Sequence, residues 1–233
     1  MRVVFVHGAC VRDGAWWWQP TGDLLARQGV TSVAPALPSC GEAGAPAGLG
    51  GPGYAEDVAA VRAELTSSQE PTVVVVHSYG GIVAAEAAAG VEAVTHVLLI
   101  ASYLPVVGQS LSSFAGTEPA AFLDVDEQTG TFGARPELFV GTFLQDCPQV
   151  ADDALTRLAR QSLAVTTAPV QAAASLSVPS TYLVCAQDRG TPARMQRDFA
   201  TRADAVVEID AGHHPFLSQP QAVANLVMDV ARA

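Results

Sequence analysis

The most informative segment of the chain runs Thr72-Val-Val-Val-Val-His-Ser78-Tyr-Gly-Gly-Ile-Val-Ala-Ala-Glu86. A run of β-branched residues passes directly into an alanine-rich segment of helical composition. A strand that turns sharply into a helix places the serine at the joint, Ser78, in a strained and exposed position at the C-terminal end of the strand. Gly80 and Gly81 have no Cβ atom and so allow the helix to lie close to the strand. The segment therefore predicts a reactive serine at the edge of a parallel sheet.

This segment departs from the usual serine motif at one position. The usual signature is Gly-x-Ser-x-Gly, and Val76 stands where the first glycine is expected. A branched side chain must therefore find room two positions before Ser78. In the competing interpretation the chain is an ordinary parallel α/β protein, and Ser78 only caps the helix that follows it.

Similar apolar runs alternate with helical segments along the rest of the chain. Strands are expected at residues 3–6, 31–34, 72–76, 95–100, 180–185 and 205–209. Helices are expected at residues 17–27, 55–66, 81–89, 193–201 and 219–231. Because the apolar runs are nearly continuous, both faces of each strand should be covered. The order predicts an α/β fold with a mostly parallel sheet and helices on both of its faces.

Two segments interrupt this alternation. Residues 38–53 are rich in glycine and proline and are expected to form a loop over the edge of the sheet. Residues 103–178 contain five phenylalanines, a helical pattern near residues 154–163 and no convincing strand. We interpret 103–178 as a helical cap, inserted after the strand that follows the serine-bearing helix, within a single domain of residues 1–233.

Composition and charge exclude several classes of protein. The 233 residues are 49% hydrophobic and 15% charged, which fits a folded domain and not a disordered chain. The formal net charge of −11 disfavours nucleic acid and anionic membrane surfaces as partners. No apolar run reaches the roughly 18 residues of a membrane span, and Met1 leads almost directly into a strand without a signal peptide. We therefore expect a cytoplasmic protein with no nucleic-acid and no membrane partner.

The four cysteines do not indicate a metal site or a disulfide framework. They are widely spaced and form no Cys-x-x-Cys pair. In a protein without a secretion signal, cysteines of this kind are expected to be buried thiols.

Other polar segments also follow strands directly. Ala9 follows the first strand in His7-Gly-Ala9, and its amide could donate to a developing oxyanion, while His7 has a structural role. Asp188 follows the strand at 180–185, and His213 follows the last strand. Each residue taken alone has an ordinary explanation as a loop or capping residue. Because the C-terminal ends of parallel strands meet at one edge of a sheet, their shared placement beside Ser78 indicates a site.

The chain resembles the α/β-hydrolases, and more narrowly the hydroxynitrile lyase and plant methylesterase-like branch with its bacterial esterase relatives. The order of Ser78, Asp188 and His213 matches the nucleophile, acid and base of that superfamily. Further similarity lies in the segments His7-Gly-Ala-Cys10, Gly14-Ala-Trp16, Tyr103-Leu-Pro105, Gln187-Asp188 and Gly212-His213. The resemblance implies an α/β-hydrolase fold and catalysis without a metal or an organic cofactor.

The resemblance also implies a role for each candidate residue. Ser78 would be the nucleophile, His213 the general base, and Asp188 the acid that orients it. The backbone amides of Ala9 and Tyr79 would form the oxyanion hole. From the residues alone, Asp210 is an alternative for the acid and His214 an alternative for the base, because both lie close to His213 in the sequence.

We predict an esterase that cleaves small to medium, uncharged, hydrophobic carboxylic esters through an acyl-enzyme intermediate. The predicted cap is rich in phenylalanine and aliphatic residues and has few arginines, which indicates an apolar pocket for a small-molecule substrate. One alternative is cyanohydrin cleavage. The hydroxynitrile lyases have a threonine after the first-strand histidine and a lysine after the catalytic histidine, where this chain has Gly8 and His214. The other alternative is a small-molecule receptor on the same fold.

Overall fold

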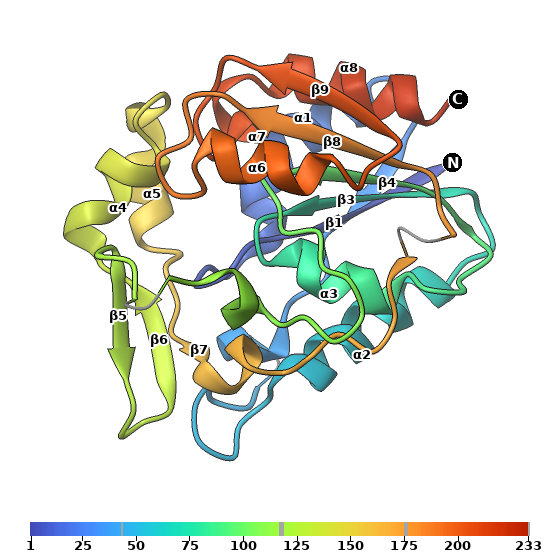
Figure 1. Cartoon of the computed structure of the whole chain (residues 1–233). Coiled ribbons are helices and arrows are strands. Elements are labelled where there is room, and N and C mark those ends of the chain that lie inside the picture. The colour runs from blue at the N-terminus through green and yellow to red at the C-terminus, as the bar shows by residue number, and fades with distance from the viewer. Residues whose placement is uncertain (43, 117–118, 175–176, 233) are drawn as a thin grey trace.

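The chain folds around a six-stranded sheet, seen in a computed structural model that describes residues 1–42, 44–116, 119–174 and 177–232 (Figure 1). Every pairing in this sheet is parallel. In spatial order the strands are β2 (Thr31–Val33), β1 (Arg2–Val6), β3 (Thr72–His77), β4 (Val94–Ile100), β8 (Ser180–Cys185) and β9 (Ala205–Ile209). The six predicted strands and the parallel α/β class are confirmed.

Helices cover both faces of the sheet. They are α1 (Gly14–Ala26), α2 (Tyr54–Thr66), α3 (Gly80–Ala87), α6 (Ala193–Ala200), α7 (Pro215–Ser218) and α8 (Pro220–Val230). Alternate residues of a strand point to opposite faces. Val4 and Val74 accordingly belong to a buried cluster with side chains of α2, α3 and α6, whereas Val3 and Val73 belong to a second cluster with α1, α7 and α8. The five helices predicted between the strands and at the end of the chain are confirmed.

The prediction that both faces of every strand are covered is wrong for the two edge strands. All residues of β2 are exposed, and so are those of β9 up to Glu208. An edge strand has a neighbour on one side only and lies at the margin of the helical layers. The four central strands, in contrast, are buried almost throughout.

The segment between β4 and β8 contains helices, as expected, but it also contains strands that the sequence analysis missed. The helical elements are η2 (Leu111–Phe114), α4 (Pro136–Phe143), η3 (Pro148–Val150), α5 (Ala151–Leu155) and η4 (Leu163–Thr166). The strands are β5 (Leu123–Asp126), β6 (Thr131–Ala134) and β7 (Gln161–Ser162), which form an antiparallel sheet beside the main body (Figure 1). We keep the name cap for residues 103–178.

The reason for this error is the length of the strands. None of β5, β6 and β7 exceeds four residues, too short to show a clear period of two. The helical pattern predicted near 154–163 ends with α5 at Leu155. Residues 117, 118, 175 and 176 of the predicted cap and residue 43 of the predicted loop lie outside the described residues. The division of 1–233 into one domain with a cap at 103–178 stays a prediction.

No helix among the described residues is long and apolar enough to cross a membrane. The four cysteines are free and buried, as expected.

Candidate active site

Ser78 lies at the turn between β3 and α3. Its φ is 52°, a left-handed conformation that is strained for a residue with a side chain. Contacts with the chain after β4 hold this turn, because the Ser78 carbonyl accepts hydrogen bonds from Ser102 Oγ (2.8 Å) and the Tyr103 amide (3.2 Å). A Cβ atom on Gly80 would lie 2.5 Å from the Val6 carbonyl oxygen. The glycine after the turn is therefore required for α3 to lie this close to β1.

Val76 is accommodated without a glycine at its position. Its side chain is completely buried and belongs to the same apolar cluster as Tyr79 and Ile82. The branched residue thus packs into the core on the α3 side of the sheet, and the turn at Ser78 keeps its strained form.

The loop after β1 touches the serine turn. A Cβ atom built on Gly8 would lie 3.1 Å from Ser78 Cβ, which brings the backbone leading to Ala9 beside the serine. His7 is buried, and its Nδ1 donates to the Gly8 carbonyl (2.8 Å) while its Nε2 lies 3.4 Å from Glu42 Oε2. Since His7 holds its own loop, the structural role predicted for it agrees with these contacts.

Asp188 and His213 form a buried pair. His213 Nδ1 lies 2.7 Å from Asp188 Oδ2, and the Asp188 side chain is fully buried. A carboxylate can only accept, so Nδ1 carries the proton and Nε2 is left free to accept one. The structure therefore brings together the acid and the base that the sequence analysis chose.

The two alternative residues make different hydrogen bonds. Asp210 is exposed, and its Oδ1 accepts a hydrogen bond from Gln187 Nε2 (2.8 Å). His214 is buried, and its Nδ1 donates to the Phe143 carbonyl (2.9 Å) while its ring stacks on Trp17. Neither contact leads to the Asp188–His213 pair.

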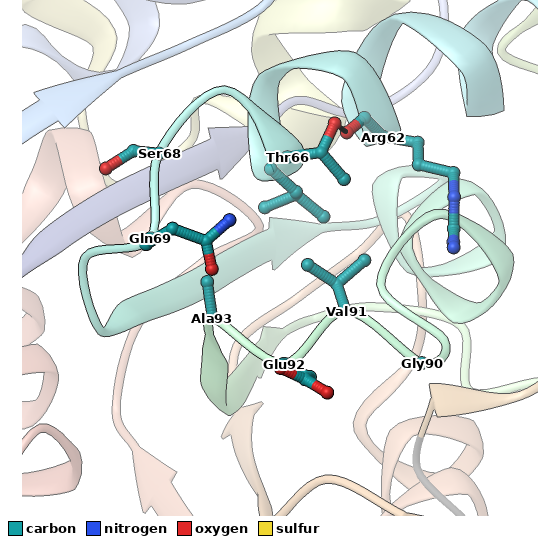
Figure 2. A pocket seen from close by; sticks show the side chains of 9 residues that line it. Arg62, Thr66, Ser68, Gln69, Gly90, Val91, Glu92 and Ala93 are labelled. Carbon is teal, nitrogen blue, oxygen red and sulfur yellow. Dashed lines mark hydrogen bonds between the residues drawn. The ribbon is translucent and has the colours of Figure 1, made fainter.

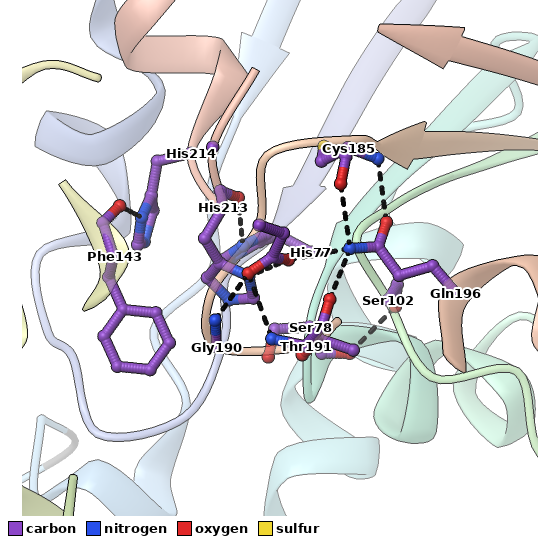
Figure 3. Close-up of polar contacts among 12 residues, drawn as sticks. His77, Ser78, Ser102, Phe143, Cys185, Gly190, Thr191, Gln196, His213 and His214 are labelled. Atoms are coloured by element: carbon purple, nitrogen blue, oxygen red, sulfur yellow. Dashed lines mark hydrogen bonds and ion pairs between the residues drawn. The ribbon is translucent and has the colours of Figure 1, made fainter. Parts of the chain in front are cut away.

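Asp188 is held by residues that the sequence analysis did not identify. Its Oδ1 accepts from the amides of Gly190 (2.8 Å) and Thr191 (3.0 Å), and its Oδ2 also accepts from Gln196 Nε2 (2.8 Å) (Figure 3). The Gln196 side chain is itself fixed, because its Oε1 accepts from the Cys185 amide (2.8 Å). These bonds fix the direction of the carboxyl group. No local pattern marks Gln196, whose role depends on α6 folding back over the end of β8.

Two further buried histidines surround His213. The His77 ring lies 4.4 Å from that of His213, and His77 Nε2 donates to the His213 carbonyl (3.0 Å). Burial, with the neighbouring His213 and His214, lowers the pKa of His77 well below its usual value. Burial, together with His213, lowers the pKa of His214 to about 3. Both rings are therefore neutral at ordinary pH.

The cap packs directly on residues 212–214, which we call the histidine loop. The Phe143 ring at the end of α4 lies 5.0 Å from the His213 ring, and the Gly212 amide donates to Asp146 Oδ2 (2.6 Å). A side chain on Gly190 would collide with the Phe143 ring. Phe143 of the cap lies beside His213 (Figure 3), a contact that was not predicted from the sequence.

Two surface hollows lie away from these residues. One, of about 170 Å³, is lined by residues between Arg62 and Gln69 and between Gly90 and Ala93 (Figure 2). These residues precede β3 and β4, so this hollow lies at the opposite edge of the sheet from Ser78. The other, of about 590 Å³, lies between the glycine-rich loop, the β5–β6 hairpin and residues 158–160. Neither is lined by Ser78, Asp188 or His213.

Within the described residues, no group of three or more histidine, cysteine or acidic side chains is arranged to hold a metal ion.

Comparison with known proteins shows the family and the fold. Residues 3–226 match the model of the alpha/beta hydrolase family. The chain is 29% identical to the alpha/beta hydrolase nvfD of Aspergillus novofumigatus, over 77% of this chain and 79% of that protein. It is 25% identical to Methylesterase 7 of Arabidopsis thaliana, over 99% and 96% of the two chains. The crystal structure of a pyrethroid hydrolase from Sphingobium faniae JZ-2 superposes with a TM-score of 0.87 at 22% identity, covering 100% of this chain and 98% of that one.

Proposed function

The chain belongs to the alpha/beta hydrolase family, and we propose that it is a serine esterase that cleaves small to medium, uncharged, hydrophobic carboxylic esters. The observation that carries the proposal is the buried hydrogen bond of 2.7 Å between His213 Nδ1 and Asp188 Oδ2, at the same sheet edge as the strained Ser78. The pair fits a general base with its orienting acid, and Ser78 would be the nucleophile. The similar proteins support it, since they include a methylesterase and a pyrethroid hydrolase by name.

The proposed reaction has two halves. Ser78 Oγ attacks the ester carbonyl carbon while His213 Nε2 accepts the hydroxyl proton, and the carbonyl electron pair moves onto oxygen. The amides of Ala9 and Tyr79 stabilise that oxyanion, each contributing about 3 kcal/mol. His213 then gives its proton to the leaving alcohol, which leaves an acyl group on Ser78. Water, deprotonated by the same histidine, releases the acid and restores the serine.

The alternative of cyanohydrin cleavage is disfavoured by the state of His214. A positive charge next to the base would be needed to stabilise a leaving cyanide. Burial lowers the pKa of His214 to about 3, so this ring supplies no such charge. No observation favours the receptor alternative.

The first prediction is covalent labelling at Ser78. An alkyl phosphonofluoridate is expected to modify the protein once, with Ser78 Oγ displacing fluoride from phosphorus, because His213 activates only this hydroxyl. Intact-mass spectrometry would count the adducts, and peptide mapping would locate them. Ser78→Ala is the control that should remain unmodified. Labelling of another residue, or no labelling, would contradict the proposed mechanism.

The second prediction concerns the charge of the substrate. The cap supplies aromatic rings near the base, with Phe143 against His213 and Phe122 against Phe143. All three cap arginines already have acidic partners: Arg135 and Arg160 pair with Asp124, and Arg157 pairs with Asp13. No cap arginine is therefore left to bind an anionic acyl chain.

Neutral p-nitrophenyl esters of short to medium acyl chains should accordingly be hydrolysed with higher kcat/KM than matched esters that end in a carboxylate. Selection among the neutral chains should be shallow, since an apolar pocket discriminates by only about 1–3 kcal/mol per methylene. A chelator such as EDTA should not change the rate. A preference for the charged esters, or loss of rate with EDTA, would refute this assignment of substrate class.

A further inference from the structure

A chain of buried hydrogen bonds connects the two loops that carry the proposed oxyanion amides. The Cys10 amide donates to Gln161 Oε1 (3.0 Å), and Gln161 Nε2 donates to Ser39 Oγ (2.9 Å). Ser39 Oγ donates to Asp57 Oδ2 (2.6 Å), which also accepts from the Tyr79 hydroxyl (2.8 Å). Gln161, Ser39, Asp57 and Tyr79 are all completely buried. The network thus runs from the residue after Ala9 to the residue after Ser78.

Each donor and acceptor in this network has only one consistent assignment. A backbone amide can only donate, so the oxygen of Gln161 must face Cys10 and its NH₂ group must face Ser39. The Ser39 hydroxyl must then donate its hydrogen bond to Asp57, which also accepts from the Ser39 amide (2.9 Å). Burial raises the pKa of Asp57, while the bonds from Ser39 and Tyr79 favour its ionised form. A fully satisfied network of this kind is rigid, and a broken one leaves costly unpaired groups.

Gln161 binds a strained part of the loop after β1 that contains Ala9 and Cys10, which we call the oxyanion loop. Cys10 has a φ of 61°, and both of its backbone polar groups are hydrogen-bonded, since its carbonyl also accepts from the Ala159 amide (2.9 Å). Because a peptide unit is planar, fixing the Cys10 N–H fixes the plane that joins Ala9 to Cys10. The Ala9 N–H belongs to the preceding peptide plane, which meets this one at Ala9 Cα, so Gln161 of β7 fixes one side of the residue that carries the proposed oxyanion amide.

At the other end, the network anchors Tyr79. Its side chain is tied to Asp57 on α2, while its backbone begins the turn into α3. Within the described residues, no hydrogen bond of this network involves Asp188 or His213. It can therefore influence the oxyanion hole without changing the acid–base pair.

We propose that Gln161 is a positioning residue for the oxyanion hole, acting through Cys10 at one end and through Ser39, Asp57 and Tyr79 at the other. The inference rests on the proposed esterase function, because it concerns the amides that would stabilise that reaction's oxyanion. A displacement of such donors by a fraction of an ångström weakens binding of the transition state more than binding of the substrate.

The test is Gln161→Met, which keeps the side-chain length but removes both hydrogen bonds. With a p-nitrophenyl ester, kcat is expected to fall by roughly 10- to 100-fold with KM unchanged, less than the loss of a whole oxyanion donor. The affinity for a trifluoromethyl ketone of the same acyl chain should fall in parallel. Ser78 Oγ adds to the carbonyl carbon of that inhibitor, the serine proton moves to His213 Nε2, and the former carbonyl oxygen becomes a negative oxygen in the hole.

The matched control is Ser162→Ala. Ser162 neighbours Gln161 on β7, is equally buried, and accepts from the Gly48 amide (3.0 Å) instead of the oxyanion loop. It should lose thermal stability without losing kcat. Tyr79→Phe approaches the network from its other end, because it keeps the amide and removes only the hydroxyl. It should reproduce the Gln161→Met pattern, and it serves as the second test if Gln161→Met fails to fold.

Two kinds of failure are distinguishable. If the wild-type protein neither hydrolyses esters nor is labelled at Ser78, the proposed function fails and this inference falls with it. If the wild-type protein is active while folded Gln161→Met and Tyr79→Phe retain kcat and inhibitor affinity, only the positioning role is refuted. The positioning role would also be refuted if KM of these variants rose while their affinity for the inhibitor stayed at the wild-type value.

Discussion

Replacing His213 with alanine is expected to lower kcat for a neutral ester by a factor of about 10⁶. Ser78 is a poor nucleophile at its ordinary pKa and depends on a base to accept its proton. In the structure, His213 Nδ1 is hydrogen-bonded to Asp188, so Nε2 is the nitrogen that can accept the serine proton. The measurement is the steady-state rate of ester hydrolysis, with Ser78→Ala as the blank and circular dichroism to confirm folding.

His214→Ala is the matched control for this prediction. It removes an adjacent and equally buried imidazole, whose Nδ1 binds the Phe143 carbonyl and whose ring stacks on Trp17. Because that ring is neutral and does not contact Asp188, its loss should lower the melting temperature and leave most of the turnover in the folded protein. If His214→Ala abolished turnover and His213→Ala did not, the base would have to be reassigned.

Asp188→Asn is expected to lower kcat by about 10⁴ while the fold is kept. The amides of Gly190 and Thr191 require an oxygen at Oδ1, so the new NH₂ group would take the place of Oδ2. There it would face Nδ1 of His213 and the NH₂ of Gln196, which both donate to Oδ2 in the native protein. His213 would then have to accept at Nδ1 and carry its proton on Nε2, the tautomer that cannot take a proton from Ser78.

The matched control is Asp210→Asn. Asp210 lies three residues before His213 in the sequence, but it is exposed and bound to Gln187. Its substitution should leave kcat close to the wild-type value, as measured in the same ester assay. If Asp210→Asn lowered kcat as much as Asp188→Asn, the assignment of Asp188 as the acid that orients His213 would be contradicted.

Phe143 and Asp146 connect the cap to the loop that carries His213. Phe143 lies against the His213 ring, its carbonyl binds His214, and Asp146 holds the Gly212 amide. The histidine loop is therefore supported by the end of α4 as well as by the main sheet. Substitutions at the end of α4 are therefore expected to alter the position of His213.

The sequence by itself determined the order of the main elements and the edge of the sheet at which the polar residues gather. Continuous apolar runs and helical composition are local properties, and they marked the six strands of the main sheet. In a parallel sheet the C-terminal ends of the strands share one edge, so Ser78, Asp188 and His213 were predicted together from their positions after strands. The strands of the cap were missed because two to four residues carry too little periodic signal.

Only the tertiary structure decided which side chains meet. From the sequence, both Asp188 and Asp210 were candidates to bind His213. In the structure Asp188 forms that hydrogen bond, and Asp210 binds Gln187 instead. The hydrogen bond from the Cys10 amide to Gln161 joins residues 151 positions apart, and no local sequence pattern predicts it. A hydrogen bond needs two groups within about 3 Å and in the correct direction, and the packing of segments distant in the chain sets both.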